Sequence, residues 1–257
     1  MRRTRPGIAA AVGLVALALF AEPVAAQSSV TAGLINDLNA KLLYVAIPIT
    51  LVVELILLYT VVRFKDNDEA VPTRENRRLE ITWTIATAFV LLFVGVASYG
   101  VLANENVTLQ ESDQVAPEND DVVVTAEAYQ WGWNMRYPEA GNFTAPMGDN
   151  GPQIVIPKGQ DVYFRVTSTD VLHAFHVPEL GLKQDAIPGQ TNTIKTVALE
   201  TGTYQGYCAE YCGVGHSRMY FTIKVVSQQQ YDQFVAQQQG SSSDVEPDDP
   251  VVSAADE

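Results

Sequence analysis

Two long apolar runs stand out in the first hundred residues of the chain. One covers residues 42–62 and the other covers residues 81–103. Each is close to the roughly 20 residues that an α-helix needs to cross a lipid bilayer. The pattern therefore predicts a transmembrane hairpin of two helices over residues 42–103, preceded by a short segment over residues 27–41.

Positive charge between the two runs predicts the orientation of the hairpin. The connecting loop contains Lys65, Arg74, Arg77 and Arg78, and short loops rich in Lys and Arg lie on the cytoplasmic side. We therefore expect a multi-pass plasma-membrane protein with both termini on the extracytoplasmic side. Glu54 lies inside the first run, where a carboxyl is costly. It indicates either contact with a partner helix or polar path, or a protonated group used in helix packing.

The first 26 residues are typical of a secretory signal peptide. Arg2, Arg3 and Arg5 precede an apolar stretch over residues 8–20, and small residues then lead to a predicted cleavage after Ala26. The paired arginines also allow a twin-arginine signal. The alternative is an uncleaved membrane anchor.

The second half of the chain alternates between apolar and polar positions, as at Val162, Phe164 and their neighbours. Short alternating runs separated by Gly, Pro and Asn favour an antiparallel sandwich or barrel. We expect a polar linker over residues 104–120 and an all-β domain over residues 121–228. Residues 229–257 are rich in Gln, Ser and acidic side chains, so we expect an acidic disordered tail.

The charge of the chain excludes one class of partner. The formal net charge is −14, whereas a protein that binds nucleic acid needs a basic face for the phosphates. An acidic surface suits a cationic protein partner, or solubility in concentrated salt.

Metal-binding side chains are few and concentrated. Cys208 and Cys212, the only cysteines, share a stretch of twelve residues with His216 and Met219, and His173 can supply a second imidazole. Sulfur and imidazole ligands select copper or zinc. The cysteine spacing is compatible with zinc, but zinc has no use for the thioether. A mononuclear blue-copper site would use one cysteine, whereas a copper pair bridged by both thiolates uses the whole set.

Two interpretations that involve no metal also apply to the cysteines and histidines. A disulfide is the default for two cysteines in an exported domain, yet it leaves His173, His216 and Met219 unexplained. The third histidine, His176, is expected to pack or to form a hydrogen bond, because the metal ligands are already accounted for. The chain has no Cys-x-x-Cys-His motif, so a c-type haem is not expected on it.

The run from Cys208 to Met219 resembles the copper-A loop of cytochrome c oxidase subunit II. Further segments that resemble this family are residues 79–85, 130–133, 170–173 and 181–189. The resemblance covers residues 42–226. It implies a membrane-anchored all-β protein, in which a two-helix transmembrane hairpin carries a cupredoxin-like Greek-key β-barrel. Tyr207, Tyr211 and the acidic tail depart from the usual pattern of the family.

The resemblance also implies roles for individual residues. The implied ligands of two copper ions are His173, Cys208, Glu210, Cys212, His216 and Met219. Glu210 would meet one copper through its backbone oxygen and reach a magnesium ion at the boundary with subunit I through its side chain. Trp131 would be the residue at which electrons enter, although it could simply pack like Trp133. Glu80 would lie at the cytoplasmic mouth of a proton path, or be an ordinary carboxylate at a helix start.

The function implied is that of an electron-input subunit of a haem-copper terminal oxidase. Its partners would be the haem-bearing subunit I, subunit III, membrane lipid, and a soluble donor, either cytochrome c or a small blue-copper protein. Oxygen reduction and proton pumping would occur on subunit I, so no catalytic residue is expected on this chain. The alternatives are a copper-free structural subunit of a quinol oxidase, the copper domain of nitrous oxide reductase, and a zinc- or disulfide-stabilised membrane binding module.

Overall fold

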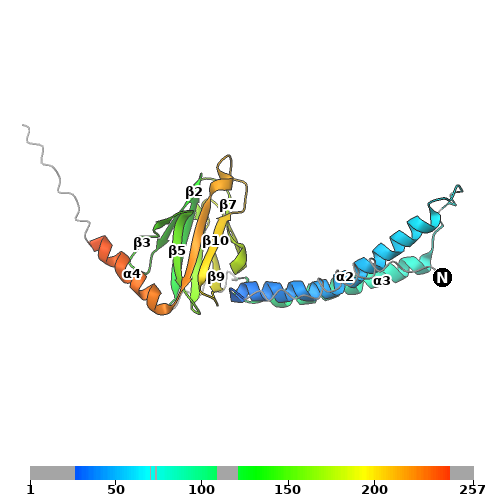
Figure 1. The fold of residues 1–257 in the computed structure, drawn as a ribbon, viewed down its shortest axis with the longest axis horizontal. Helices are drawn as coiled ribbons and strands as arrows, with labels where there is room; N and C mark the ends of the chain where they lie inside the picture. Colours follow the sequence, from blue (N-terminus) through cyan, green and yellow to red (C-terminus); the bar gives the residue numbers. More distant parts are fainter. Residues whose placement is uncertain (1–26, 70, 73, 109–120, 244–257) are drawn as a thin grey trace, which may run out of the picture.

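The computed structural model describes residues 27–69, 71–72, 74–108 and 121–243. The predicted signal peptide and most of the predicted linker lie outside these residues. Figure 1 shows a long helical hairpin that leads into a β-sandwich, with a further helix on the other side of the sandwich.

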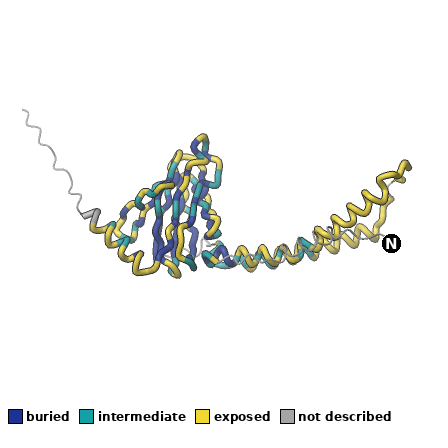
Figure 2. The backbone as a smooth tube through the Cα atoms, in the orientation of Figure 1, coloured by how far each residue is buried: buried dark blue, intermediate teal, exposed yellow. Residues whose placement is uncertain are grey.

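The hairpin consists of α2 (Val30–Phe64) and α3 (Arg77–Leu102). Ser29 caps α2 by accepting a hydrogen bond from the backbone N–H of Ala32, at 3.0 Å. Asn76 caps α3 in the same way through the N–H of Leu79. Both helices are long and apolar enough to cross a membrane, and Figure 2 shows them largely exposed, as expected for helices that face lipid or other subunits.

The β domain is a sandwich of two sheets. The strands of the first sheet, in spatial order, are β3 (Phe143–Thr144), β2 (Gly132–Tyr137), β1 (Val122–Tyr129), β6 (Asp161–Ser168) and β9 (Asn192–Val197). Those of the second are β4 (Met147–Gly148), β5 (Gly151–Pro157), β11 (Tyr220–Val226), β10 (Gly202–Cys208), β7 (His173–Val177) and β8 (Leu182–Ala186). Two short 3₁₀ helices, η2 (Pro178–Leu180) and η3 (His216–Arg218), complete the domain. The predicted fold class, an all-β cupredoxin-like domain on a two-helix anchor, is confirmed.

The core lies between the sheets because side chains alternate across each strand. Phe164 of β6 is fully buried, and it packs on Phe175 of β7, whose ring stacks on Phe221 of β11 with centroids 4.7 Å apart. Trp133 of β2 closes this cluster edge-on against Phe221, at 5.4 Å. Trp133 also reaches the end of the loop that joins β10 to β11, because its Nε1–H donates to the carbonyl of Met219 at 3.4 Å.

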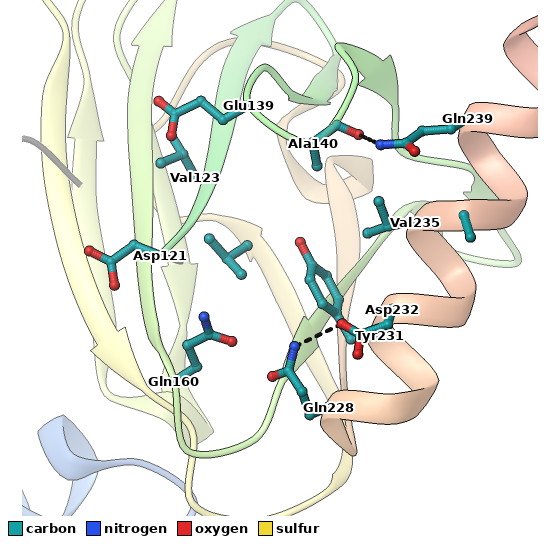
Figure 3. Close-up of a pocket in the computed structure, with 12 residues that line it drawn as sticks. Asp121, Val123, Glu139, Ala140, Gln160, Gln228, Tyr231, Asp232, Val235 and Gln239 are labelled. Atoms are coloured by element: carbon teal, nitrogen blue, oxygen red, sulfur yellow. Dashed lines mark hydrogen bonds between the residues drawn. The ribbon is translucent and has the colours of Figure 1, made fainter. Parts of the chain in front are cut away.

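The sequence expectation of a disordered tail from residue 229 is wrong as far as residue 243. These residues form most of α4 (Gln228–Ser243). Tyr231, Phe234 and Val235 lie on one face of the helix, and the ring of Phe234 packs against Tyr137 and Phe143 at 5.9 and 5.7 Å. Figure 3 shows Tyr231 and Val235 pointing from α4 towards the sandwich. Burial of this apolar face offsets the conformational entropy that is lost when an otherwise polar segment becomes ordered. Residues 244–257 lie outside the described part.

The start of α2 is attached to the sandwich. Ser29 forms an antiparallel bridge with Ala198, and its hydroxyl donates to the carbonyl of Leu180 at 2.7 Å. The N–H of Leu199 donates to the carbonyl of Ser28 at 2.8 Å. These contacts fix the direction in which the first helix leaves the β domain.

A buried lysine makes a second attachment near the end of the hairpin. The ammonium of Lys195 in β9 lies 2.8 Å from the carboxylate of Asp161 and 3.4 Å from that of Glu105, which follows α3. Lys195 therefore links the sandwich to the segment that leaves the second helix.

Candidate metal centre

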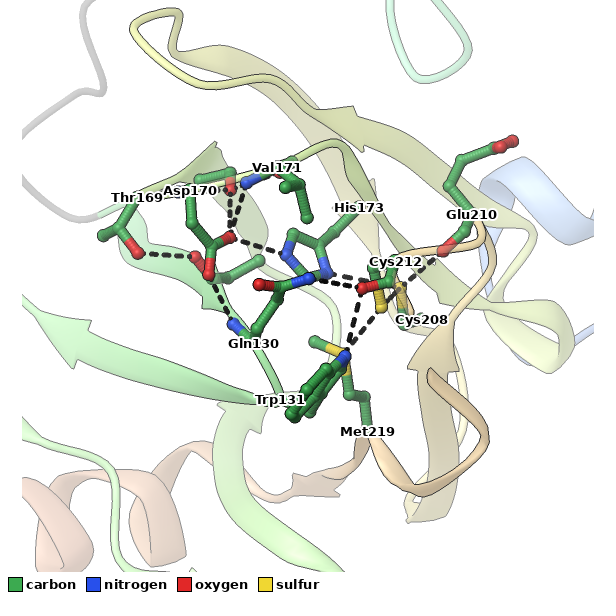
Figure 4. A network of polar contacts seen from close by, with 12 residues as sticks. Gln130, Trp131, Thr169, Asp170, Val171, His173, Cys208, Glu210, Cys212 and Met219 are labelled. Carbon is green, nitrogen blue, oxygen red and sulfur yellow. Dashed lines mark hydrogen bonds and ion pairs between the residues drawn. The ribbon is translucent and has the colours of Figure 1, made fainter. Parts of the chain in front are cut away.

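Strand pairing brings four sulfur and imidazole side chains to one end of the sandwich. Cys208 ends β10, and its N–H donates to the carbonyl of Met219 at 3.0 Å, which closes the loop that contains Cys212 and His216. β7 pairs antiparallel with β10, so His173, the first residue of β7, lies beside Cys208. Figure 4 shows His173, Cys208, Cys212 and Met219 converging.

The two sulfurs lie between the two imidazoles. The Sγ atoms of Cys208 and Cys212 are 3.9 Å apart. Nδ1 of His173 lies 3.7 Å from the Cys208 sulfur, and Nδ1 of His216 lies 3.6 Å from the Cys212 sulfur. Two ligands at metal distances of ~2.0–2.3 Å with tetrahedral geometry are separated by about 3.3–3.8 Å. The spacing of these donors therefore fits ligands that share metal ions.

Met219 and Glu210 complete the predicted donor set. The Met219 sulfur lies 3.2 Å from the sulfur of Cys212, and the backbone oxygen of Glu210 lies 3.2 Å from the sulfur of Cys208. Each sulfur thus has a weak donor beside it. The structure brings together all six residues that the sequence analysis assigned to this site.

Both cysteines are free and buried. Burial, followed by the neighbouring Cys208, raises the pKa of the Cys212 thiol to about 12. A thiolate at this position therefore needs a nearby cation, and a metal ion enforces deprotonation of cysteine ligands. Buried thiolate, thioether and imidazole donors of this kind select copper or zinc.

Asp170 fixes the orientation of the His173 ring. Its Oδ1 lies 3.0 Å from Nε2 of His173, and its carboxylate accepts from the backbone N–H groups of Val171 and Gln130, both at 2.6 Å. Burial alone would raise the pKa of Asp170, but these hydrogen bonds lower it to about 2. The ionised carboxylate holds the proton on Nε2 and leaves Nδ1 free to face the Cys208 sulfur.

Trp131 lies against the loop that carries the candidate ligands and is partly exposed. Trp131 is 42% exposed. Trp133 is only 3% exposed, which confirms its predicted packing in the core. The indole Nε1–H of Trp131 donates to the carbonyl of Cys212 at 3.0 Å. Gly215 admits the ring, because a Cβ there would lie 2.4 Å from its Cγ. The exposed indole thus contacts the backbone of a candidate ligand directly.

Among the described residues, the Glu210 carboxylate, His176 and Glu80 form no hydrogen bond or ion pair with the donor atoms of the cluster. The Glu210 carboxylate is 3.7 Å from the ammonium of Lys183. Nδ1 of His176 lies 2.7 Å from the carbonyl of Leu182, consistent with its expected hydrogen-bonding role. Glu80 lies in the first turn of α3, at the far end of the hairpin from the sandwich (Figure 1).

Sequence reasoning gave no role to Gln130 and Asp170. An acid three positions before a candidate ligand histidine was the one local signal for Asp170. Nothing near Gln130 in the sequence indicates its contacts, because they are made with residues 40 and 82 positions away.

The fold and the donor cluster define a membrane-anchored cupredoxin-like protein with a candidate soft-metal centre. Residues 122–226 match the periplasmic domain of cytochrome c oxidase subunit II, and residues 17–101 match the transmembrane domain of the same subunit. The chain therefore belongs to the cytochrome c oxidase subunit II family and is part of a haem-copper oxidase, an oxidoreductase. Partnership with subunit I is implied by this membership.

Two relatives in sequence agree with this assignment, and one solved structure is reported for comparison. Cytochrome c oxidase subunit 2 of Cereibacter sphaeroides is 34% identical over 256 residues, covering 86% of this chain and 79% of that protein. A probable cytochrome c oxidase subunit 2 of Rickettsia bellii is 32% identical, covering 76% of each chain. The solved periplasmic domain of cytochrome oxidase subunit II from Bradyrhizobium japonicum is 32% identical, with a TM-score of 0.44, covering 49% of this chain and 97% of that one.

Proposed function

We propose that this chain accepts electrons from a soluble donor at a dinuclear copper-A centre and passes them to haem in subunit I, where oxygen is reduced and protons are pumped. One observation carries the proposal: two free, buried sulfurs 3.9 Å apart, each with the Nδ1 of a different imidazole beside it. When bound, a copper pair bridged by thiolates would store one electron with little change in geometry.

The near symmetry of the donors favours a metal pair over a single ion. His173 with Cys208, and His216 with Cys212, form two equivalent nitrogen–sulfur pairs. A single blue-copper ion needs only one cysteine, so it would leave a buried thiol without a role. A copper-free structural subunit would need none of these side chains. Met219 is the proposed axial ligand on one side, and the carbonyl of Glu210 on the other.

Trp131 is the proposed point at which electrons enter the chain. The indole is partly exposed, so a donor can touch it, and its hydrogen bond to the Cys212 carbonyl gives a short connection to the loop. Aromatic residues with one exposed edge are frequent anchors of protein interfaces. The donor is a separate protein, either cytochrome c or a small blue-copper protein, and the net charge of −14 favours a cationic one.

The other proposed roles concern the membrane side of the complex. The basic charge of the loop between α2 and α3 supports a cytoplasmic position for that loop. In the proposed orientation the copper domain is outside the cytoplasm, and Glu80 is near the cytoplasmic surface at the mouth of a proton path. A magnesium ion at the boundary with subunit I would take the side chain of Glu210, in competition with Lys183. Subunit III is a further proposed partner.

The test is the copper content of the full-length chain, purified in detergent and reconstituted with copper. We expect two copper ions per chain and a paramagnetic resonance spectrum with hyperfine splitting from two equivalent copper nuclei. Cys212→Ser should abolish this signal, and His176→Gln, outside the donor set, should retain it. One metal ion per chain, or two thiols oxidised to a disulfide in the native protein, would contradict the proposal.

A further inference from the structure

Gln130 contacts both segments that carry the candidate ligands. It lies in the turn between β1 and β2, next to Trp131. Its backbone N–H donates to Oδ2 of Asp170 at 2.6 Å, and its side-chain Nε2 donates to the carbonyl of Cys212 at 2.8 Å (Figure 4). Through Asp170 it supports the ring of His173, and through the carbonyl it holds the cysteine loop.

The carbonyl of Cys212 has its full complement of hydrogen bonds. A carbonyl oxygen has two lone pairs, and here it accepts one hydrogen bond from Gln130 and one from the indole of Trp131, at 2.8 and 3.0 Å. Two donors from the same turn fix the plane of the peptide that follows Cys212. That plane includes the Cα atom of Cys212, from which its side chain extends towards the other donors.

We propose that Gln130 is a positioning residue that joins the His173 segment to the Cys212 loop and holds both in the arrangement that binds copper. The inference rests on the proposed copper site, and it adds a residue that binds no metal. The amide of Gln130 suits this position because it supplies an N–H donor without a charge. A carboxylate of the same shape would place an acceptor against the Cys212 carbonyl and remove the hydrogen bond.

The experiment compares Gln130→Glu with wild type in the full-length chain. Gln190→Glu is the matched control. Gln190 is exposed, lies in the loop before β9, and its amide contacts Asn192 rather than a candidate ligand segment. The readouts are the rate at which a chelator removes copper, the hyperfine pattern of the bound copper, and the alkylation rate of the thiols in the metal-free chain. Loss of a residue that orients metal ligands typically costs about 10–100-fold in metal affinity.

We expect Gln130→Glu to release copper at least about tenfold faster, to change the hyperfine pattern, and to react faster with the alkylating agent, while Gln190→Glu behaves as wild type. Release and alkylation rates equal to wild type would overturn the inference. If Gln130→Glu does not fold, Gln130→Asn replaces it: the shortened amide cannot reach the carbonyl, so an unchanged release rate again overturns the inference. Failure of wild type to bind a copper pair would instead refute the proposed function, and the alkylation comparison still decides whether Gln130 holds the loop.

Discussion

Gly215→Ala tests the role of Trp131 without changing any candidate ligand. Gly215 has φ −92°, which alanine adopts without strain, so the effect is steric. The added Cβ would lie 2.4 Å from Cγ of Trp131 and 2.6 Å from its Cδ2. Ordinary carbon–carbon contacts begin near ~3.5 Å, so the indole must move by about 1 Å or swing into solvent.

The displaced indole should lose its hydrogen bond to Cys212. The bond is 3.0 Å long, and a shift of about 1 Å takes it beyond hydrogen-bonding distance. A hydrogen bond of this kind contributes about 0.5–1.5 kcal/mol to folding. Because Trp131 is already 42% exposed, we expect the free energy of unfolding to fall by only about 1 kcal/mol. Copper content should not change, because no candidate ligand is altered and Gln130 still donates to the carbonyl of Cys212.

The reaction with the donor should be much more sensitive than the fold. Misplacing a reacting group by ~1 Å can reduce a rate by about 100-fold, so we expect the rate of electron uptake in the assembled oxidase to fall by about 10- to 100-fold. The assay is stopped-flow mixing with a reduced soluble donor. Gly240→Ala is the control, since no described atom lies within 4 Å of its added Cβ. A wild-type rate in Gly215→Ala, with the indole displaced, would refute Trp131 as the point where electrons enter.

Four further outcomes are expected. Met219→Leu should retain copper and shift its reduction potential, because an axial thioether bond is weak; complete loss of copper in metal analysis contradicts this. Lys195→Met should lower the free energy of unfolding by about 1–3 kcal/mol in urea titrations, because the buried hydrogen bond to Asp161 is charge-assisted. Burial alone would lower the pKa of Lys195, but Asp161 raises it above 10.5. The contribution of this ion pair to the free energy of unfolding is therefore complete below pH 10.5, the unfolded pKa, and is lost as pH rises through the higher folded pKa. Phe234→Ala should reduce stability by about 1–2 kcal/mol in thermal unfolding, because its ring packs on Tyr137. The association rate of a cationic donor should fall with added salt; a rate constant that does not change with ionic strength excludes electrostatic steering.

The donor cluster could be predicted from the sequence because its residue types are scarce. Few chemical interpretations fit a loop that contains two cysteines, a methionine and a histidine. The fold then had only to bring the ring of His173 to the sulfur of Cys208. Trp131 and Trp133 were harder to separate, since residues two apart on a strand share a face. Trp131 lies in the turn before β2, so that rule does not apply to it, and one ring is exposed while the other is buried.

The supporting contacts could not be predicted because they depend on distant parts of the chain. Gln130 meets Asp170 and Cys212 only after the sandwich has formed. α4 was missed for a different reason: the low average hydrophobicity of the tail concealed Tyr231 and Phe234, whose spacing of three places them on one helical face. Composition predicted disorder where a few well-placed apolar side chains were enough to dock a helix.

The loop between β10 and β11 lies between two different side chains, one from the turn between β1 and β2 and one from the loop itself. In Figure 4 the indole of Trp131 and the carboxylate of Glu210 lie on opposite sides of the sulfur pair. The indole contacts the Cys212 carbonyl, and the backbone oxygen of Glu210 contacts the Cys208 sulfur. Under the proposed function, a donor therefore meets an aromatic surface on one side while subunit I meets a carboxylate on the other. Electrons would then cross only the width of this loop, which the buried Trp133 contacts from the core through its hydrogen bond to the carbonyl of Met219.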